Sequence, residues 1–321
     1  MQKLAIGIDI GGTSIKYGVL TEDGEVKLKE SFPTKEFKEV DDFINYLSER
    51  IKHSLAGLKS DHKLVGVGIG APNGNFYRGT IEHAPNLNWK GIVPLADLLS
   101  KKIKVPVYLT NDANAAAMGE MTYGGAKNMK NFIMITLGTG LGSGFVANGN
   151  LILGQDGFAG EFGHTTVFHD GRECGCGKKG CLETYVSATG IKRTVVKLLS
   201  KAKTDSILRD YSYNNITSEQ IYKAAMNGDQ LAIDAFDFTG KILGMKLADA
   251  ITIISPEAIF LFGGLANAGK LIFEPTKKYM EEYNFPIYKN KVKLLSSLLP
   301  ECEAAILGSA SLVWSNEKKQ H

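Results

Sequence analysis

The chain has 321 residues, of which 44% are hydrophobic and 22% charged. This length predicts about two domains, each with its own core, and the composition excludes intrinsic disorder. Lysine and arginine exceed aspartate and glutamate by 37 − 34 = 3 scattered charges, so neither nucleic acid nor a membrane surface is expected as a partner. With Asp9 inside its apolar run, the N-terminus does not resemble a secretory signal, and we expect a cytoplasmic protein.

The first part of the chain predicts strands that alternate with helices. Strands are expected over 3–10, 14–20, 25–31, 64–70 and along VPVYLTND at 105–112. Helices are expected over 41–58, with Asp41 or Asp42 as its cap, over 94–102, and along ANAAAMGEM after Asp112. Strands alternating with helices predict a parallel core.

Residues 132–147 repeat the opening order of strand, glycine loop and strand, at an offset of 127 residues. Two unrelated glycine-turned hairpins could produce this match, but we favour two related lobes. Further along, a capping-box helix after Thr217, a helix over 229–252, a strand over 258–262 and a final amphipathic helix over 303–314 are expected. Glycine, at 36 residues, is in excess and is expected in loops and turns.

Three glycine loops that follow strands could bind phosphate, because residues without Cβ let backbone N–H groups approach an anion closely. Each loop taken alone could be an ordinary hairpin turn. The loops are Gly11-Gly12-Thr13, Gly138-Thr139-Gly140 and Gly263-Gly264. Two nucleotide-binding motifs are nearly matched and are rejected. GLANAGK at 264–270 has the spacing of a P-loop but lacks its hydroxyl residue, and the glycines at 66–68 resemble a dinucleotide-binding fingerprint but are followed by Pro72 in place of a helix.

Asp9 lies within an apolar strand directly before the first glycine loop, and Lys16 follows seven residues later. A buried aspartate is unfavourable unless it is paired or coordinates a cation. Hydrated Mg²⁺ is a natural partner, because it needs only one or two carboxylates. The alternative is an aspartate at the edge of a hairpin that caps its own turn. We assign Asp9 and Lys16 to cofactor binding.

A cysteine cluster predicts a metal site. Cys174, Cys176 and Cys181 form a C-x-C-x₄-C pattern, and His164 precedes them, which together offers the three thiolates and one imidazole of tetrahedral, structural Zn²⁺. Redox-active or merely buried thiols are the alternative. Only Lys178 and Lys179 add positive charge, so a DNA-binding zinc finger is not expected. Cys302 is expected to be a small buried residue.

Five segments in order, DIGGTSIKYGV, LTNDANAAAMGE, LGTGLGSGF, GEFGH and CGCGKKGCLE, resemble the ROK family of bacterial sugar kinases, especially its glucokinases. The resemblance implies an α/β, two-lobed, actin-like and hexokinase-like ATPase fold, built from duplicated ribonuclease-H-like domains with a cleft between the lobes. On this basis we expect a smaller lobe from 1–115 and 302–321, and a larger lobe from 116–301 that carries the zinc loop. A homodimer is usual in the family.

The implied activity is phosphorylation of a hexose at its 6-hydroxyl, with glucose as the expected substrate and ATP with Mg²⁺ as the donor. Asp112 lies at a strand-to-helix junction, where it could serve as the catalytic base or simply cap the helix; the family correspondence favours the base. Asn86 could be no more than a turn residue. The family pattern places six residues at the sugar: Asn86, Asn111, Asp112, Glu161, His164 and Glu183.

Other activities remain as alternatives. An N-acetylglucosamine or N-acetylmannosamine kinase, or a fructokinase, would share the same catalytic motifs. A sugar-responsive repressor of the family would carry a helix-turn-helix ahead of the first lobe, whereas the first strand here begins at residue 3. A chaperone-like or actin-like ATPase without a small-molecule acceptor would leave the GEFGH and cysteine motifs unexplained.

Overall fold

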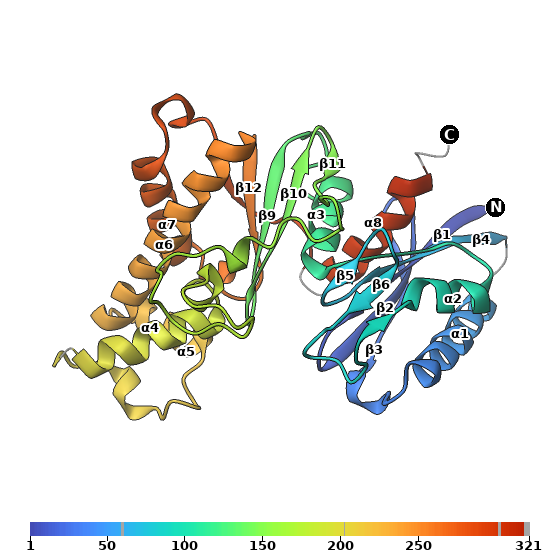
Figure 1. Ribbon diagram of the computed structural model, residues 1–321, viewed down its shortest axis with the longest axis horizontal. Coiled ribbons are helices and arrows are strands. Elements are labelled where there is room, and N and C mark those ends of the chain that lie inside the picture. Colours follow the sequence, from blue (N-terminus) through green and yellow to red (C-terminus); the bar gives the residue numbers. More distant parts are fainter. Residues whose placement is uncertain (59–60, 202, 301–302, 318–321) are drawn as a thin grey trace. The chain divides into compact units, whose positions relative to one another are not determined.

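The computed structural model describes residues 1–58, 61–201, 203–300 and 303–317 (Figure 1). The chain divides into two compact units. The first comprises Met1–Met129, Asn150–Gly160 and Leu298–His321, and the second comprises Lys130–Gly149 and Glu161–Ser297. Cys302, expected to be buried, lies outside the described residues.

The first unit contains a five-stranded sheet in the order β3-β2-β1-β4-β8. β1 (Gln2–Ile10) pairs antiparallel with β2 (Ser14–Thr21), which pairs antiparallel with β3 (Val26–Pro33). On its other side β1 pairs parallel with β4 (His62–Gly70), and β4 with β8 (Val107–Thr110). The expected strands are therefore confirmed, and the parallel part of the sheet brings three strand ends to one edge.

Helices cover both faces of this sheet (Figure 1). Side chains alternate across β1, so that its isoleucines pack with α1 (Val40–Gly57) and α2 (Leu95–Ile103) in one core. The opposite face packs against α8 (Ala304–Glu317), which also packs against α3 (Asp112–Thr122). The unit also has a small sheet, formed by β5 (Gly74–Asn75), β6 (Thr80–Glu82) and β7 (Ile92–Val93).

Two helix predictions need correction. α1 begins at Val40, one residue before the expected cap, and no side chain caps it; Asp41 and Asp42 lie in its first turn, where their charge is favourable to the helix dipole. α8 is not amphipathic, since every residue from Ile306 to Trp314 is buried. A helix that is buried between a sheet and a second helix has no solvent-exposed face, so its sequence lacks the polar stripe of an amphipathic helix.

Several glycines lie within strands and not in the expected loops. Gly7 in β1 pairs with Gly18 in β2 and with Gly68 in β4, which forms a row of glycines across three strands. A Cβ on Gly7 or Gly68 would collide with a backbone carbonyl of α8, at Ile306 and Ser309 respectively. The glycine row therefore lets the buried helix lie directly on the sheet.

The second unit repeats the topology of the first. Its sheet contains the strands β10, β9, β12 and β13 in that order. β9 (Phe132–Leu137) pairs antiparallel with β10 (Leu141–Ala147) and parallel with β12 (Ala258–Phe262), which pairs parallel with β13 (Lys293–Ser296). β11 (Asn150–Leu151) belongs to a segment of the first unit. The order and directions of β10, β9, β12 and β13 match those of β2, β1, β4 and β8, which confirms the prediction of two related lobes.

Helices of the second unit surround a core of their own. α5 (Ser218–Met226) begins with the expected capping box of Thr217, and α6 (Gln230–Ile254) packs along α7 (Lys270–Tyr283). α4 (Ala188–Lys201), α7 and β13 have no counterpart among the predicted elements. Among the described residues, no helix is both long and apolar enough to cross a bilayer.

The two units differ from the expected lobes in three places: the first unit includes all of α3, it includes Asn150–Gly160, and its last segment begins at Leu298. Gly119 of α3 lies against Gly308 of α8, where a Cβ on Gly119 would be 2.8 Å from the Cα of Gly308. Close helix packing of this kind joins α3 to the helix that covers the first sheet.

Candidate functional site

The carboxyl ends of three parallel strands meet at one edge of the first sheet. Asp9 lies near the end of β1, opposite Gly70 at the end of β4, and Lys16 is its partner across the hairpin. β8 ends at Thr110, and Asn111 and Asp112 follow directly. The sheet thus brings Asp9, Lys16 and the Asn111-Asp112 pair, which are remote in sequence, to the same edge.

The charge of Asp112 acts on the pKa of Asp9. Burial raises the pKa of the Asp9 carboxyl to about 6, the negative charge of Asp112 adds to the rise, and Lys16 opposes it. Desolvation also raises the pKa of Asp112, against a hydrogen bond of 2.9 Å from the N–H of Ala113. Asp112 is nevertheless exposed, so solvent partly screens its charge. Its raised pKa makes the carboxylate a stronger base than an ordinary aspartate.

Asn111, and not Asp112, caps α3. The side-chain oxygen of Asn111 accepts a hydrogen bond of 2.7 Å from the N–H of Asn114, and its backbone is extended. Asp112 is the first residue of the helix, and its carboxylate accepts a hydrogen bond of 2.9 Å from the N–H of Ala113. The alternative interpretation of Asp112 as the N-cap of the helix is therefore wrong, because Asn111 occupies that position.

The first glycine loop lies against Asn86. A Cβ on Gly12 would be 2.9 Å from the Cβ of Asn86, so only glycine allows this approach. The Gly11 carbonyl accepts from the hydroxyl of Thr34 over 2.6 Å, and the Thr13 carbonyl from the Thr34 N–H over 3.1 Å. Two of the sequence-predicted groups, the 11–13 loop and Asn86, are thus in contact.

The two glycine loops of the second unit also lie side by side. β9 and β12 are parallel neighbours, and the loops follow their carboxyl ends. Gly263 has a φ of 99°, and a Cβ there would be 2.8 Å from the Leu137 carbonyl, just before the other loop. Gly138, Thr139, Gly140, Gly263 and Gly264 therefore form one glycine-rich edge.

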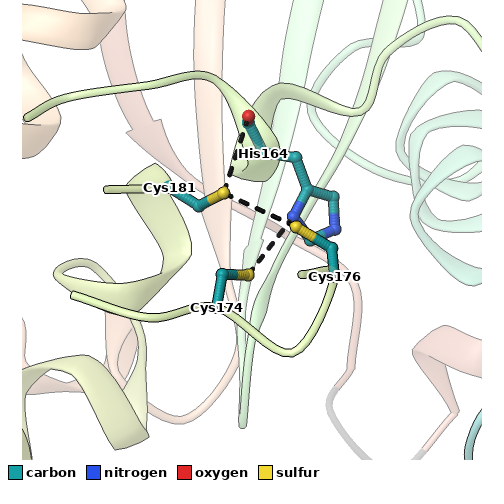
Figure 2. Close-up of side chains that lie close together, drawn as sticks. All are labelled: His164, Cys174, Cys176 and Cys181. Carbon is teal, nitrogen blue, oxygen red and sulfur yellow. Dashed lines mark hydrogen bonds between the residues drawn. The ribbon is translucent and has the colours of Figure 1, made fainter. Parts of the chain in front are cut away.

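The cysteine motif and His164 converge on one point (Figure 2). Sγ of Cys176 is 3.7 Å from Sγ of Cys181, and Sγ of Cys174 is 3.6 Å from Nδ1 of His164. All four ligand atoms lie within 4.8 Å of one another. His164 ends the short helix η2 (Phe162–His164), while the cysteines lie on the loop that follows.

These distances fit tetrahedral zinc. Bonds of about 2.3 Å to sulfur and about 2.0 Å to nitrogen place neighbouring sulfurs about 3.8 Å apart and sulfur about 3.5 Å from nitrogen. Without a cation, burial raises the pKa of the Cys174 and Cys181 thiols. A metal ion that replaces their protons would allow three thiolates to lie together, so the residues fit the ion.

Two carboxylates flank the ring of His164. An oxygen of Glu161 is 4.0 Å from Nε2, and an oxygen of Glu183 is 3.8 Å from Nδ1. Glu183 lies in η3 (Leu182–Thr184); one of its oxygens accepts from Sγ of Cys174 over 3.0 Å, and the other is 3.5 Å from the N–H of Leu141. Glu183 therefore lies between the metal cluster and the glycine loop at 138–140.

Arg172 is a residue that the sequence analysis did not single out. Its guanidinium lies 4.5 Å from the centre of the Tyr185 ring. It donates to the carbonyls of Thr184 and Gly190 and to the hydroxyl of Thr194, over 2.7 to 2.9 Å. Burial lowers the pKa of Arg172 to about 10, so the side chain stays charged at neutral pH. Only its place two residues before Cys174 could have drawn attention to it.

The chain belongs to the ROK family, whose model matches residues 5–316. It is 37% identical to the glucokinase of Halalkalibacterium halodurans over 316 residues, which are 97% of this chain and 95% of that protein. A ROK family glucokinase from Streptomyces griseus, solved in complex with glucose and AMPPNP, is 33% identical with a TM-score of 0.79, over 97% of this chain and 99% of that one.

Regulators of the same family are also similar. The xylose repressor of Caldicellulosiruptor bescii is 30% identical over 314 residues, which are 97% of this chain and 78% of the repressor. These similarities confirm the expected two-lobed, actin-like ATPase fold.

Proposed function

We propose that this chain transfers the γ-phosphate of ATP to the 6-hydroxyl of a hexose, and that glucose is its main substrate. The observation that carries the proposal is the carboxylate pair at the edge of the first sheet. Asp112 is exposed and is not the N-cap of α3, and its negative charge contributes to the raised pKa of Asp9. Similarity to bacterial glucokinases over nearly the whole chain supports the same activity.

Asp112 would act as the general base. It accepts the proton of the 6-hydroxyl while the hydroxyl oxygen forms a bond to the γ-phosphorus. The bond between that phosphorus and the bridging oxygen breaks, and ADP leaves with the electron pair. The raised pKa of Asp112 suits this role, because a more basic carboxylate takes up the proton more readily.

Asp9, Lys16 and the glycine loops would hold the nucleotide. A bound Mg²⁺ neutralises negative charge on the phosphates, and the Asp9 carboxylate is suited to hold such a hydrated ion. Lys16, the partner of Asp9 across the hairpin, adds a positive charge. Backbone N–H groups of Gly11-Gly12-Thr13, Gly138-Thr139-Gly140 and Gly263-Gly264 would donate to phosphate oxygens.

Asn86, Asn111, Glu161, His164 and Glu183 would bind the sugar hydroxyls, which require directional donors and acceptors. Zn²⁺ at His164, Cys174, Cys176 and Cys181 would be structural, since four protein ligands complete its tetrahedron. Its binding would keep Glu161 and Glu183 on either side of the His164 ring.

The test is ADP release by the purified chain with glucose, mannose, fructose, N-acetylglucosamine and N-acetylmannosamine. We expect glucose to give the highest kcat/KM. Asp112→Asn should lower kcat by about 10² to 10⁴, the usual contribution of a general base, and leave ATP binding intact. Asp97→Asn, which removes an exposed carboxylate from α2 of the same unit, is the control and should be fully active.

The same assay separates the alternatives. Preference for an N-acetylhexosamine or for fructose would retain the kinase mechanism but replace its substrate. A chain that binds sugar without sugar-dependent ADP release would act as a regulator, a role supported by the 30% identity to a xylose repressor. Near-normal turnover by Asp112→Asn would remove Asp112 as the base.

We also propose that the protein is a cytoplasmic homodimer. Light scattering should then give twice the chain mass of 34.8 kDa. A monomer would contradict the dimer without affecting the proposed reaction.

A further inference from the structure

The segment that follows the metal loop holds the glycine loop at 138–140 by its carbonyls. The N–H of Ala188 donates to the Gly138 carbonyl over 2.9 Å, and the hydroxyl of Thr189 donates to the Thr139 carbonyl over 2.8 Å. In a planar trans peptide, the carbonyl of one residue and the N–H of the next point in opposite directions. Fixing these two carbonyls therefore fixes the direction of the N–H groups of Thr139 and Gly140.

Arg172 in turn holds both ends of that segment. Its guanidinium donates to the Thr184 carbonyl over 2.7 Å, and to the Gly190 carbonyl and the Thr194 hydroxyl over 2.9 Å each. Its backbone N–H donates to the Tyr185 hydroxyl over 2.9 Å, and the Tyr185 ring packs against the guanidinium. Residues 185–189 are thus enclosed between two attachment points of a single side chain.

We propose that Arg172 and Thr189 are positioning residues that connect the metal-binding loop to the phosphate-binding N–H groups of Thr139 and Gly140. Arg172 lies two residues before Cys174, so its backbone is set by the fold of the metal loop. Folding of that loop is thereby linked to nucleotide affinity, in addition to any effect on the sugar. This inference rests on the proposed nucleotide-binding role of the 138–140 loop.

The main test uses Thr189→Val, an almost isosteric change at an exposed residue that removes the hydroxyl, which donates to the Thr139 carbonyl and also lies 3.0 Å from the Ser187 hydroxyl. We expect affinity for a non-hydrolysable ATP analogue, measured by calorimetry, to fall about twofold to tenfold, the usual effect of losing one hydrogen bond. Zinc content, measured by atomic emission, and glucose affinity should not change. In steady state, KM for ATP should rise more than kcat falls.

Arg172→Met and Arg172→Lys test the other end of the connection. Methionine removes every donor and should weaken analogue binding more than Thr189→Val does, while the cysteine ligands still hold zinc. Lysine, which cannot reach three acceptors at once, should restore only part of the affinity. The control is Arg193→Met: the Arg193 side chain donates to the Glu173 carbonyl on the same loop over 3.0 Å, whereas the Arg172 guanidinium is the group that donates to the Thr184 and Gly190 carbonyls.

Wild-type analogue affinity in Thr189→Val and in Arg172→Lys would overturn the inference. So would a drop in Arg193→Met equal to that in Arg172→Met, because the effect would then follow from disturbing the metal loop in general. If Arg172→Met does not fold, Thr189→Val and Arg172→Lys still decide the matter. Failure of the wild-type chain to bind the analogue would refute the proposed function, and this inference with it.

Discussion

Replacing Asp9 with asparagine should stabilise the first unit while it impairs the proposed magnesium site. Burial and the charge of Asp112 raise the pKa of Asp9 from 3.8 to about 6. The shift of about 2 units, at about 1.4 kcal/mol each, means that ionising Asp9 costs the folded state about 3 kcal/mol. Asparagine has nearly the same shape and no charge, so it avoids this cost.

The sign of the effect depends on pH. Between about pH 4 and pH 6 the folded chain binds a proton at Asp9 that the unfolded chain has released, so the free energy of unfolding of the wild type falls as pH rises. Asp9→Asn has no carboxyl group at this position, so its free energy of unfolding lacks this dependence on pH. Its advantage should be near zero at pH 4 and should reach about 3 kcal/mol at pH 7, without added Mg²⁺.

Tryptophan fluorescence during urea unfolding measures this directly. The chain has two tryptophans, and both Trp89 and Trp314 are buried in the first unit, so the signal reports the unit that contains Asp9. The control is Asp23→Asn: Asp23 is exposed, and the Thr21 hydroxyl lowers its pKa, so this change should give no gain at neutral pH. Adding MgATP should stabilise the wild type more than Asp9→Asn.

An advantage of equal size at pH 4 and pH 7, or a less stable variant at pH 7, would refute this reasoning. Either result would mean that ionisation of Asp9 does not lower the free energy of unfolding. The presence of an aspartate in this strand would then need another explanation.

Three further predictions follow from the same structure. The pH profile of kcat/KM should decline below about pH 6 as Asp9, and with it a magnesium ligand, becomes protonated; a profile that stays flat to pH 5 would contradict this role. Cys176→Ser, at the exposed cysteine of the cluster, should lower zinc content and glucose affinity together, and a variant that keeps both would argue against the metal site. Gly68→Ala should lower the free energy of unfolding by about 3 kcal/mol or more, since its Cβ would meet a backbone carbonyl of α8. Gly57→Ala, at an exposed helix end with nothing within 4 Å, is the matched control and should be neutral or slightly stabilising in the same urea titration.

Local patterns were sufficient for the strands and for the metal cluster. β1, β2 and β4 each contain an alternating or continuous apolar run, and their bounds lie within two residues of the predicted ones. The candidate metal ligands could be found by residue type and spacing, because His164 and the three cysteines fall within one short stretch of chain. The glycine loops were also recognisable, since each follows a strand directly.

Contacts between segments that are distant in the chain could not be predicted from local sequence patterns. The glycine row depends on the register that sets Gly7 against Gly18 and Gly68, and no local pattern records that register. α8 has no polar face because it is enclosed on all sides, so its burial could not be distinguished from amphipathic packing. In the sequence, nothing distinguishes Arg172 from other loop arginines, because its hydrogen-bond acceptors lie up to 22 residues further along and only the fold brings them to its guanidinium.

The amino-acid sequence by itself determined which residues carry chemistry: the carboxylates, the thiols and the glycine turns, because side-chain type and short-range spacing are local properties. The tertiary structure alone decided which of them act on one another. Asp112 raises the pKa of Asp9, Asn111 takes over the cap, and Arg172 holds the segment that fixes the 138–140 loop, because burial and electrostatic interaction depend on distances through space and not along the chain.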